Sequence, residues 1–137
     1  MPITEADIKL VVACALIDID GRVLVVKRPP GKPMAGLWEF PGGKVEKGER
    51  PEQALIRELK EEISIDVTAN CLAPLTFASH SYEDFHLLMP LYVCRKWDGQ
   101  IVLNEATDSK WLKPNEIRNL DTPEADVPLI AMLRDMI

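Results

Sequence analysis

The chain has 137 residues, of which 47% are hydrophobic and 28% are charged. This length and composition predict one soluble globular domain and exclude a disordered, collagen-like or coiled-coil protein. The net charge of -6, with a pI near 4.9, disfavours general binding to nucleic acid polymers or to membrane surfaces, because both need a basic patch. An anionic ligand would therefore need another source of positive charge.

The cysteines, the histidines and the first residues indicate the cellular setting. Three cysteines without a C-x-x-C spacing and two histidines indicate neither a disulfide framework nor a thiolate zinc site. The segment MPITEADIKL lacks the basic start and apolar run of a signal peptide, and no apolar run approaches the roughly 18 residues of a membrane span. We therefore expect a cytoplasmic protein that does not bind a membrane.

The first elements in the chain are strands. Residues 9–19 and 22–27 are apolar, β-branched runs on either side of Asp20-Gly21, a pattern that predicts a β-hairpin. Residues 28–51 are dense in proline and glycine, which predicts a long functional loop around a short strand.

The apolar spacing becomes helical after this loop. It predicts a helix over residues 51–63, and Pro51 suits its first position because the missing amide hydrogen is not needed there. Residues 65–78 and 85–96 predict strands, and Pro90 predicts a bulge or an edge position in the second one. The last predicted elements are a short strand at 110–112, a brief helix at 114–120 and an apolar helix at 128–137. Together these elements predict an α/β fold in which helices pack on the faces of a mixed sheet.

Three acidic residues share one side of the predicted helix at 51–63. At about 100° per residue, Glu58, Glu61 and Glu62 cover a single arc, and like charges four residues apart destabilise a helix. A hard cation such as Mg²⁺ or Mn²⁺ would relieve the repulsion, because it prefers carboxylate ligands. Five basic residues accompany six glutamates over residues 44–62, so a solvated helix with salt bridges is the alternative.

The loop before the helix favours an ion and phosphate site. Gly42 and Gly43 let backbone groups approach a ligand closely, and Glu49 could fold back toward the helix acids. Paired glycines alone serve ordinary turns in most proteins. Together with the three acids, however, the paired glycines indicate a site for an ion and a phosphate.

The segment from Gly43 to Ile65 resembles the Nudix box, G-x5-E-x7-R-E-U-x-E-E-x-G-U, in which U is aliphatic. The charged residues at its fixed positions are Glu49, Arg57, Glu58, Glu61 and Glu62. The preceding GLWEFPGGK is similar to the MutT-like branch, whose members cleave nucleoside triphosphates. The resemblance implies a single Nudix hydrolase domain over residues 1–137, with the α/β/α sandwich and mixed β-sheet of that family.

The resemblance also implies roles for individual residues. The ligands of Mg²⁺ or Mn²⁺ would be the Gly42 carbonyl, Glu58, Glu61 and Glu62. Glu58 would in addition orient or deprotonate the attacking water, while Arg57 and Glu49 would hold the acids in place. The reaction implied is hydrolysis of a nucleoside triphosphate to a nucleoside monophosphate and pyrophosphate.

Positively charged groups for the phosphates are expected at Arg28 and Lys44. Arg28 occupies the matching position of the family after the second strand, although an exposed loop charge is an equal alternative. Asp126 lies in TPEADVPLI, which resembles the stretch that meets the base in MutT-like enzymes, where its carboxylate could accept from the N7-H of 8-oxoguanine. The alternative for Asp126 is a cap of the last helix, two residues before Pro128.

Two residues next to the predicted helix depart from the pattern. Ser64 stands where the family has glycine, and a positive φ there would cost on the order of 1 kcal/mol. Arg50 replaces the usual Ser or Thr cap, although Gln53 could still form half of a capping box.

A third departure concerns a late strand. Lys110 precedes Trp111 where the branch often has a metal-linked carboxylate. Glu105 or Asp108 could substitute if their loop bends inward, and solvated loop charges are the alternative that we slightly favour.

The leading hypothesis is a metal-dependent MutT-type enzyme that removes oxidised purine nucleoside triphosphates such as 8-oxo-dGTP, and so supports DNA repair. Alternatives are hydrolysis of CTP or dCTP analogues, ADP-ribose or dinucleoside polyphosphates, and a noncatalytic nucleotide sensor. The sensor is disfavoured because a retired site has no reason to keep three mutually repelling acids. A monomer and a homodimer are both compatible with the sequence.

Overall fold

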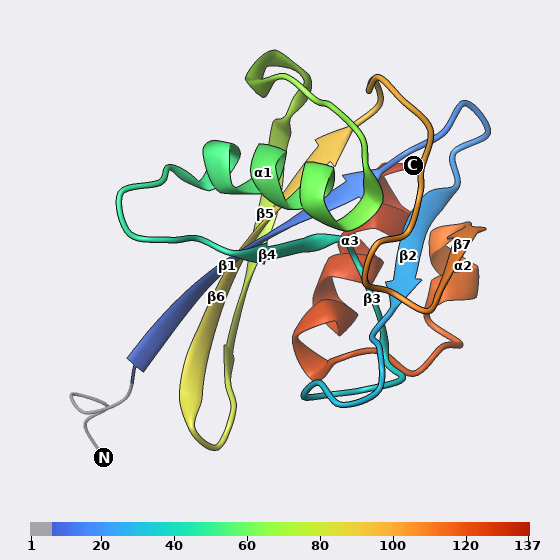
Figure 1. The fold of residues 1–137 in the computed structure, drawn as a ribbon. Helices are drawn as coiled ribbons and strands as arrows, with labels where there is room; N and C mark the ends of the chain where they lie inside the picture. The colour runs from blue at the N-terminus through green and yellow to red at the C-terminus, as the bar shows by residue number, and fades with distance from the viewer. Residues whose placement is uncertain (1–6) are drawn as a thin grey trace.

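The computed structural model describes residues 7–137, arranged as Figure 1 shows. Residues 1–6, which begin the segment considered as a signal peptide, lie outside this described part. The strands are β1 (Asp7–Leu16), β2 (Val23–Lys27), β3 (Trp38–Glu39), β4 (Gly42–Lys44), β5 (Ala73–Ser81), β6 (Phe85–Cys94) and β7 (Asp108–Leu112). The helices are α1 (Pro51–Ile63), α2 (Pro114–Ile117) and α3 (Val127–Met136), with single 3-10 turns η1 (Ala69–Cys71) and η2 (Glu124–Asp126).

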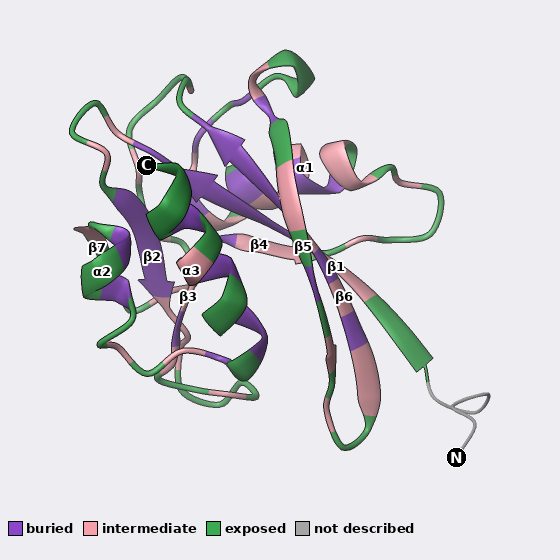
Figure 2. Cartoon of the chain, turned by 180° about the vertical axis from the view of Figure 1, so that it is seen from behind, coloured by how far each residue is buried: buried purple, intermediate pink, exposed green. Residues whose placement is uncertain are grey.

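The strands form two sheets. The first has the order β4-β1-β6-β5, in which β1 and β6 run parallel and the other neighbours are antiparallel. The second is antiparallel, with the order β3-β2-β7. Helix α1 covers one face of the first sheet, and Figure 2 shows α3 on the opposite side. The predicted α/β fold, a mixed sheet between helices, is confirmed.

The predicted hairpin around Asp20-Gly21 is only partly right. The turn is present, closed by a hydrogen bond from the Asp18 amide to the Arg22 carbonyl (2.9 Å), and it is followed by a single bridge between Ile17 and Val23. Beyond that bridge β1 and β2 separate into different sheets. The reason is that both edges of β1 are already occupied by β4 and β6, so β2 finds its partners elsewhere.

The prediction of an edge position for Pro90 is wrong, because β6 lies between β1 and β5. The pairing with β1 is interrupted between Leu88 and Leu91, around the residue that lacks an amide hydrogen. A register shift between Pro74 and Thr76 places the expected irregularity in the neighbouring strand β5. An inner strand therefore accommodates proline at the cost of a local break in the ladder.

Helix α1 has the bounds that the sequence predicts. Its apolar stripe of Leu55, Leu59 and Ile63 is buried against the sheet, and burial of such a side chain contributes roughly 1.5–3 kcal/mol. Helices α2 and α3 match the predictions at 114–120 and 128–137 within a few residues. No helix within residues 7–137 has both the length and the apolar character needed to span a bilayer.

Candidate active site

Helix α1, which carries the acidic residues of the site, begins at Pro51. Its N-cap residue, Arg50, makes no capping hydrogen bond with its side chain. Pro51 occupies the first helical position, and the Gln53 Oε1 accepts a hydrogen bond from the Arg50 amide at 2.9 Å. This is the half capping box that the sequence predicts. Only Arg50 separates Glu49, at the end of the preceding loop, from the first residue of the helix.

A cleft of about 440 Å³ lies beside α1, and residues of β1, β2, β4 and the segment before β7 complete its walls. We call it the acid cleft. Its acidic lining residues within the described chain are Glu39, Glu58, Glu61, Glu62 and Glu105. Its basic lining residues there are Lys27, Arg28, Lys32 and Lys44. The cleft thus brings together carboxylates for a cation and cationic groups for an anion.

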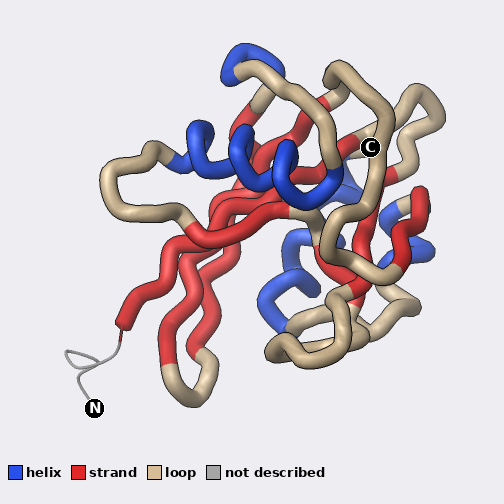
Figure 3. Tube along the Cα trace, in the orientation of Figure 1, coloured by secondary structure: helices blue, strands red, loops and turns tan. Residues whose placement is uncertain are grey.

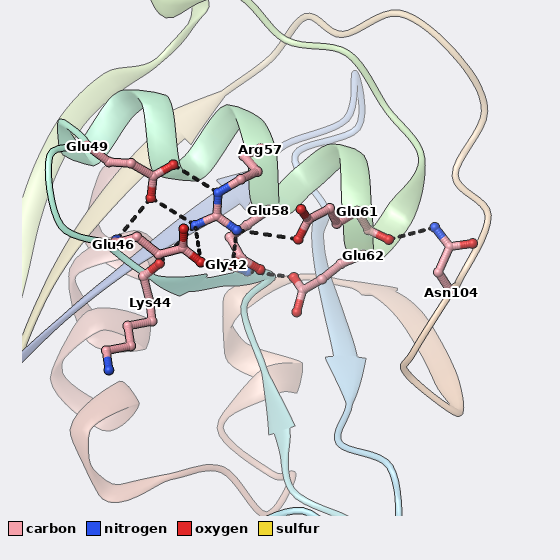
Figure 4. A network of polar contacts seen from close by, with 9 residues as sticks. All are labelled: Gly42, Lys44, Glu46, Glu49, Arg57, Glu58, Glu61, Glu62 and Asn104. Atoms are coloured by element: carbon pink, nitrogen blue, oxygen red, sulfur yellow. Dashed lines mark hydrogen bonds and ion pairs between the residues drawn. The ribbon is translucent and has the colours of Figure 1, made fainter.

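Arg57 is the centre of a polar network that joins α1 to the preceding loop (Figure 4). Its guanidinium binds Glu49 in a bidentate manner, with Nε and a terminal nitrogen each 2.9 Å from a carboxylate oxygen. It also donates to Glu58 Oε1 at 2.8 Å and to the Lys44 carbonyl at 3.1 Å. The Arg57 guanidinium and the Glu46 amide lower the pKa of Glu49 to about 2. This network fixes where the loop and the first acid of the helix lie.

Glu62 is held in the interior of the cleft by the backbone of β4. The Gly42 amide donates to Glu62 Oε2 at 3.0 Å. Burial and, to a smaller extent, the neighbouring acids raise the pKa of Glu62 to about 8. A cation at this position would favour the ionised form, because an opposite charge compensates for lost hydration.

Glu58 lies directly over Gly43. A Cβ on Gly43 would sit 2.3 Å from the Glu58 carboxyl carbon, so only glycine leaves room for this carboxylate. A Cβ on Gly42 would in turn meet the Val12 carbonyl at 2.0 Å. Burial raises the pKa of Glu58, although the Arg57 guanidinium acts in the opposite direction. Gly43 therefore permits the close approach of α1 to β4, and Gly42 permits that of β4 to β1.

The donor set suits a hard divalent cation, which prefers carboxylate oxygens. Glu58 and Glu61 both accept from Arg57, whereas Glu62 accepts from Gly42. The Glu58 side chain is 16% exposed and that of Glu61 is 59% exposed, so Glu61 lies at the rim. In this arrangement no three acidic, histidine or cysteine side chains of residues 7–137 are placed to hold a metal ion together.

The candidate phosphate contacts both line the cleft. Arg28 is not a free loop charge, because its Nε lies 2.6 Å from Glu39 Oε2 and a terminal nitrogen donates to the Pro33 carbonyl at 3.1 Å. Lys44 contributes its carbonyl to the Arg57 network while its amine extends away from that network (Figure 4).

Asp126 is 4% exposed and lies outside the lining of the acid cleft. It precedes α3, but its side chain makes no capping hydrogen bond, so the structure does not support the capping alternative. Burial and, to a smaller extent, the charge of Glu39 raise its pKa to about 7, although Arg28 acts in the opposite direction. Asp126, Glu39 and Arg28 therefore form one electrostatic group across three parts of the chain.

The structure shows the conformation or contacts of the residues at which the sequence departs from the family pattern. Ser64 has φ 67° and ψ 23°, which confirms that this position needs the left-handed conformation. The Lys110 amine lies 4.9 Å over the Trp38 ring. Glu105 lines the acid cleft, whereas Asp108 accepts from the Ser109 amide and is absent from the lining.

Two residues at the site were not recognised from the sequence. Glu39 belongs to the GLWEFPGGK segment, but its partnership with Arg28 depends on the pairing of β2 with β3. Asn104 lies in a loop without periodicity, and its hydrogen bonds to the end of α1 link residues about 40 positions apart. No local signal in the sequence identifies Asn104.

Comparisons with known proteins show the family and the fold of this chain. The sequence matches the family model of the NUDIX domain over residues 12–132. It is 43% identical over 103 residues to an 8-oxo-dGTP diphosphatase of Proteus vulgaris, an alignment that covers 74% of this chain and 86% of that protein. It is 37% identical over 121 residues to a CTP pyrophosphohydrolase of Escherichia coli K12, with 87% of each chain covered. A solved structure from work on MutT of Aliivibrio salmonicida and Vibrio cholerae is similar, with a TM-score of 0.79, 32% identity, and coverage of 96% of this chain and all of that one.

Proposed function

Because the chain belongs to the NUDIX domain family as a MutT-like member, we propose that it hydrolyses oxidised purine nucleoside triphosphates such as 8-oxo-dGTP. The products are the nucleoside monophosphate and pyrophosphate. We propose as well that residues 1–137 form one such hydrolase domain. The similarity to the Proteus vulgaris 8-oxo-dGTP diphosphatase supports this choice of substrate.

The acid cleft is the observation that carries the proposal. A protein of net charge -6 that acts on a polyphosphate needs a cation between the two anions. The cleft has carboxylates on α1, a glycine-lined wall on β4 and basic residues at its other side. This is the arrangement required for nucleotide hydrolysis with a divalent cation.

Glu58, Glu61, Glu62 and the Gly42 carbonyl hold Mg²⁺ or Mn²⁺ in this proposal. The bound ion neutralises phosphate oxygens and lowers the pKa of a water molecule. Glu58, whose carboxylate is packed against Gly43, orients that water or accepts its proton, which is the role that the family resemblance implies for it. Arg57 keeps Glu58 in place through its bidentate pair with Glu49.

The remaining charged groups recognise the nucleotide. Lys44 contacts the phosphates from β4, and Arg28 contributes positive charge while Glu39 holds its guanidinium. Asp126 meets the base edge, where a carboxyl oxygen accepts from ring N-H groups. Asp126→Ala should therefore change the ratio of kcat/KM values between bases more than it lowers turnover of the best substrate.

Hydrolysis of CTP or dCTP analogues is the second candidate. It is favoured by the similarity to the Escherichia coli CTP pyrophosphohydrolase, which extends over 87% of this chain. The metal site and the attacked triphosphate are common to both candidates. Only the base edge distinguishes them.

A substrate panel with product identification tests the proposal. Purified protein with Mg²⁺ is incubated with 8-oxo-dGTP, dGTP, CTP, dCTP and ADP-ribose, and pyrophosphate and monophosphate are quantified. We expect the highest kcat/KM for 8-oxo-dGTP. A much higher value for the cytidine nucleotides would reassign the substrate but retain the mechanism, whereas no release from any nucleotide would overturn the enzymatic proposal.

A further inference from the structure

The segment between β6 and β7 crosses the C-terminal end of α1, as the loop beside the helix in Figure 3 shows. The last turn of a helix leaves carbonyl groups without helical partners. Here the crossing segment binds three of them. Its Val102 amide donates to the Ile63 carbonyl at 3.0 Å, and its Asn104 amide donates to the Glu62 carbonyl at 2.9 Å. The third carbonyl is bound by a side chain.

Asn104 is that side chain. Its Nδ2 donates to the Glu61 carbonyl at 2.7 Å and to the Ser64 Oγ at 2.9 Å (Figure 4 shows the first of these). The Ser64 Oγ in turn donates to the Val102 carbonyl at 3.3 Å. An amide has two N-H donors in one plane, so a single asparagine can bind the helix end and its cap residue together. Asn104 thus fastens the crossing segment to the turn that carries Glu61 and Glu62.

Glu105 follows Asn104 directly and lines the acid cleft. Burial is the main cause of the raised pKa values of Glu58 and Glu62, and the charge of Glu105 adds to both. Beyond α1, the acidic residues of the described chain that line the cleft are Glu39 and Glu105, and Glu39 is paired with Arg28. Strand β7 contributes Lys110 at the position where a carboxylate was expected, and that amine lies over Trp38.

We propose that Asn104 is a positioning residue that fastens the crossing segment to the last turn of α1 and thereby holds the Glu105 carboxylate in the acid cleft, where Glu105 takes the place of the metal-linked carboxylate that the family resemblance implies. The inference rests on the proposed function. Asn104 acts through Glu105, so its effect disappears when Glu105 is neutralised. A residue that merely stabilised the helix end would act independently of Glu105.

Binding of Mn²⁺ without nucleotide tests this dependence. Isothermal titration calorimetry measures the Mn²⁺ affinity of the wild type, Asn104→Ala, Glu105→Gln and the double variant. We expect each single change to weaken binding about 10-fold, at the low end of the effect of losing a residue that orients metal ligands. The double variant should bind as weakly as Glu105→Gln and no more weakly. Unchanged affinity in Asn104→Ala, or losses that multiply in the double variant, would overturn the proposal.

A control variant and a replacement variant distinguish the proposed role from a general loss of folding or of binding. Asn115→Ala removes an exposed asparagine of α2 whose side chain has no hydrogen bond among the described residues, so it should keep wild-type affinity. If Asn104→Ala does not fold, Asn104→Asp takes its place, because it keeps the shape and loses the N-H donors. Its added negative charge attracts cations, so weaker Mn²⁺ binding supports the proposal, and unchanged or tighter binding contradicts it.

Glu62→Gln separates this proposal from the function on which it rests. If Glu62→Gln leaves Mn²⁺ binding unchanged, the metal site of the proposed function is wrong, and this inference fails with it. If Glu62→Gln weakens binding strongly while the Asn104 and Glu105 variants bind normally, only the positioning role is wrong.

Discussion

Single residues at this site are defined by unusual electrostatic surroundings. Glu49 is an ordinary ion-paired carboxylate whose pKa falls to about 2 beside Arg57. Glu62 and Asp126 are buried carboxylates whose pKa values rise to about 8 and about 7. Carboxylates that resist ionisation in a folded protein are costly unless a ligand compensates, and such groups gather at functional sites.

Neutralising Glu62 should lower activity without unfolding the protein. Glu62→Gln keeps an oxygen that accepts from the Gly42 amide, so the fold should persist. We expect kcat to fall roughly 100- to 1,000-fold, because a bound ion is worth several kcal/mol to the transition state. Steady-state kinetics beside urea unfolding measures both effects. Glu83→Gln, in the exposed β5–β6 turn, is the control, and equal turnover in the two variants would remove Glu62 from the metal site.

Asp126 should make stability depend on pH. Its folded pKa of about 7 lies above the ordinary value of 3.8, so the protonated form is favoured in the folded state. The stabilisation is complete below about pH 4 and is lost as the pH rises through about 7. Asp126→Asn cannot ionise, so its stability relative to wild type should rise by about 2–3 kcal/mol between pH 5 and pH 8, at about 1.4 kcal/mol per pKa unit. Urea unfolding at both pH values measures this, and a constant difference contradicts it.

At the scale of elements, α1 is the part of the site that the sequence predicts best. Its bounds, its buried stripe and its half capping box follow from contacts within a few residues. Its C-terminal end is different, because carbonyls of the last turn are satisfied by the crossing segment and Ser64 adopts a left-handed conformation. The start of the helix is therefore specified by contacts that are local in the sequence, whereas its end depends on tertiary contacts.

The conformation of Ser64 predicts an order of stability among substitutions. At φ 67° a Cβ is strained, so Ser64→Gly should be more stable than Ser64→Ala by about 1 kcal/mol. Both variants lose the hydrogen bond from Asn104, so their comparison isolates the backbone. Chemical denaturation measures the difference. At Ser109 in β7, which lacks a positive φ, alanine should be at least as stable as glycine, and the same order at Ser64 would contradict the strain argument.

At the scale of the whole molecule, the acid cleft exists because β1 and β2 separate into two sheets. The antiparallel sheet β3-β2-β7 brings Arg28 and Glu39 to one side of the cleft, and β4 brings the glycine pair to the other. Most charges of this acidic chain lie elsewhere on the surface. A divalent cation held as proposed would bind the folded protein and not the unfolded chain, because its ligands come together only in the assembled cleft.

Addition of a divalent cation should stabilise the folded protein. Ligand at ten times its Kd adds about 1.4 kcal/mol, which raises Tm by about 3–6 °C for a domain of this size. The shift should vanish in Glu58→Gln/Glu62→Gln, and chelation with EDTA should abolish nucleotide hydrolysis. Differential scanning calorimetry with and without Mn²⁺ measures the shift. An equal shift in the double variant would place the ion elsewhere.

The amino-acid sequence alone determined the helix with its three acids, the glycine pair before it and the resemblance that these residues carry. These features depend on spacings within about 20 residues, which helical periodicity and a motif can express. Only the tertiary structure decided that Arg28 pairs with Glu39, that Asp126 is buried beside them, that Asn104 binds the end of α1, and that Glu105 lines the cleft. Those contacts join distant segments through sheet pairing and helix-end hydrogen bonds, and no local pattern specifies which loop satisfies which carbonyl.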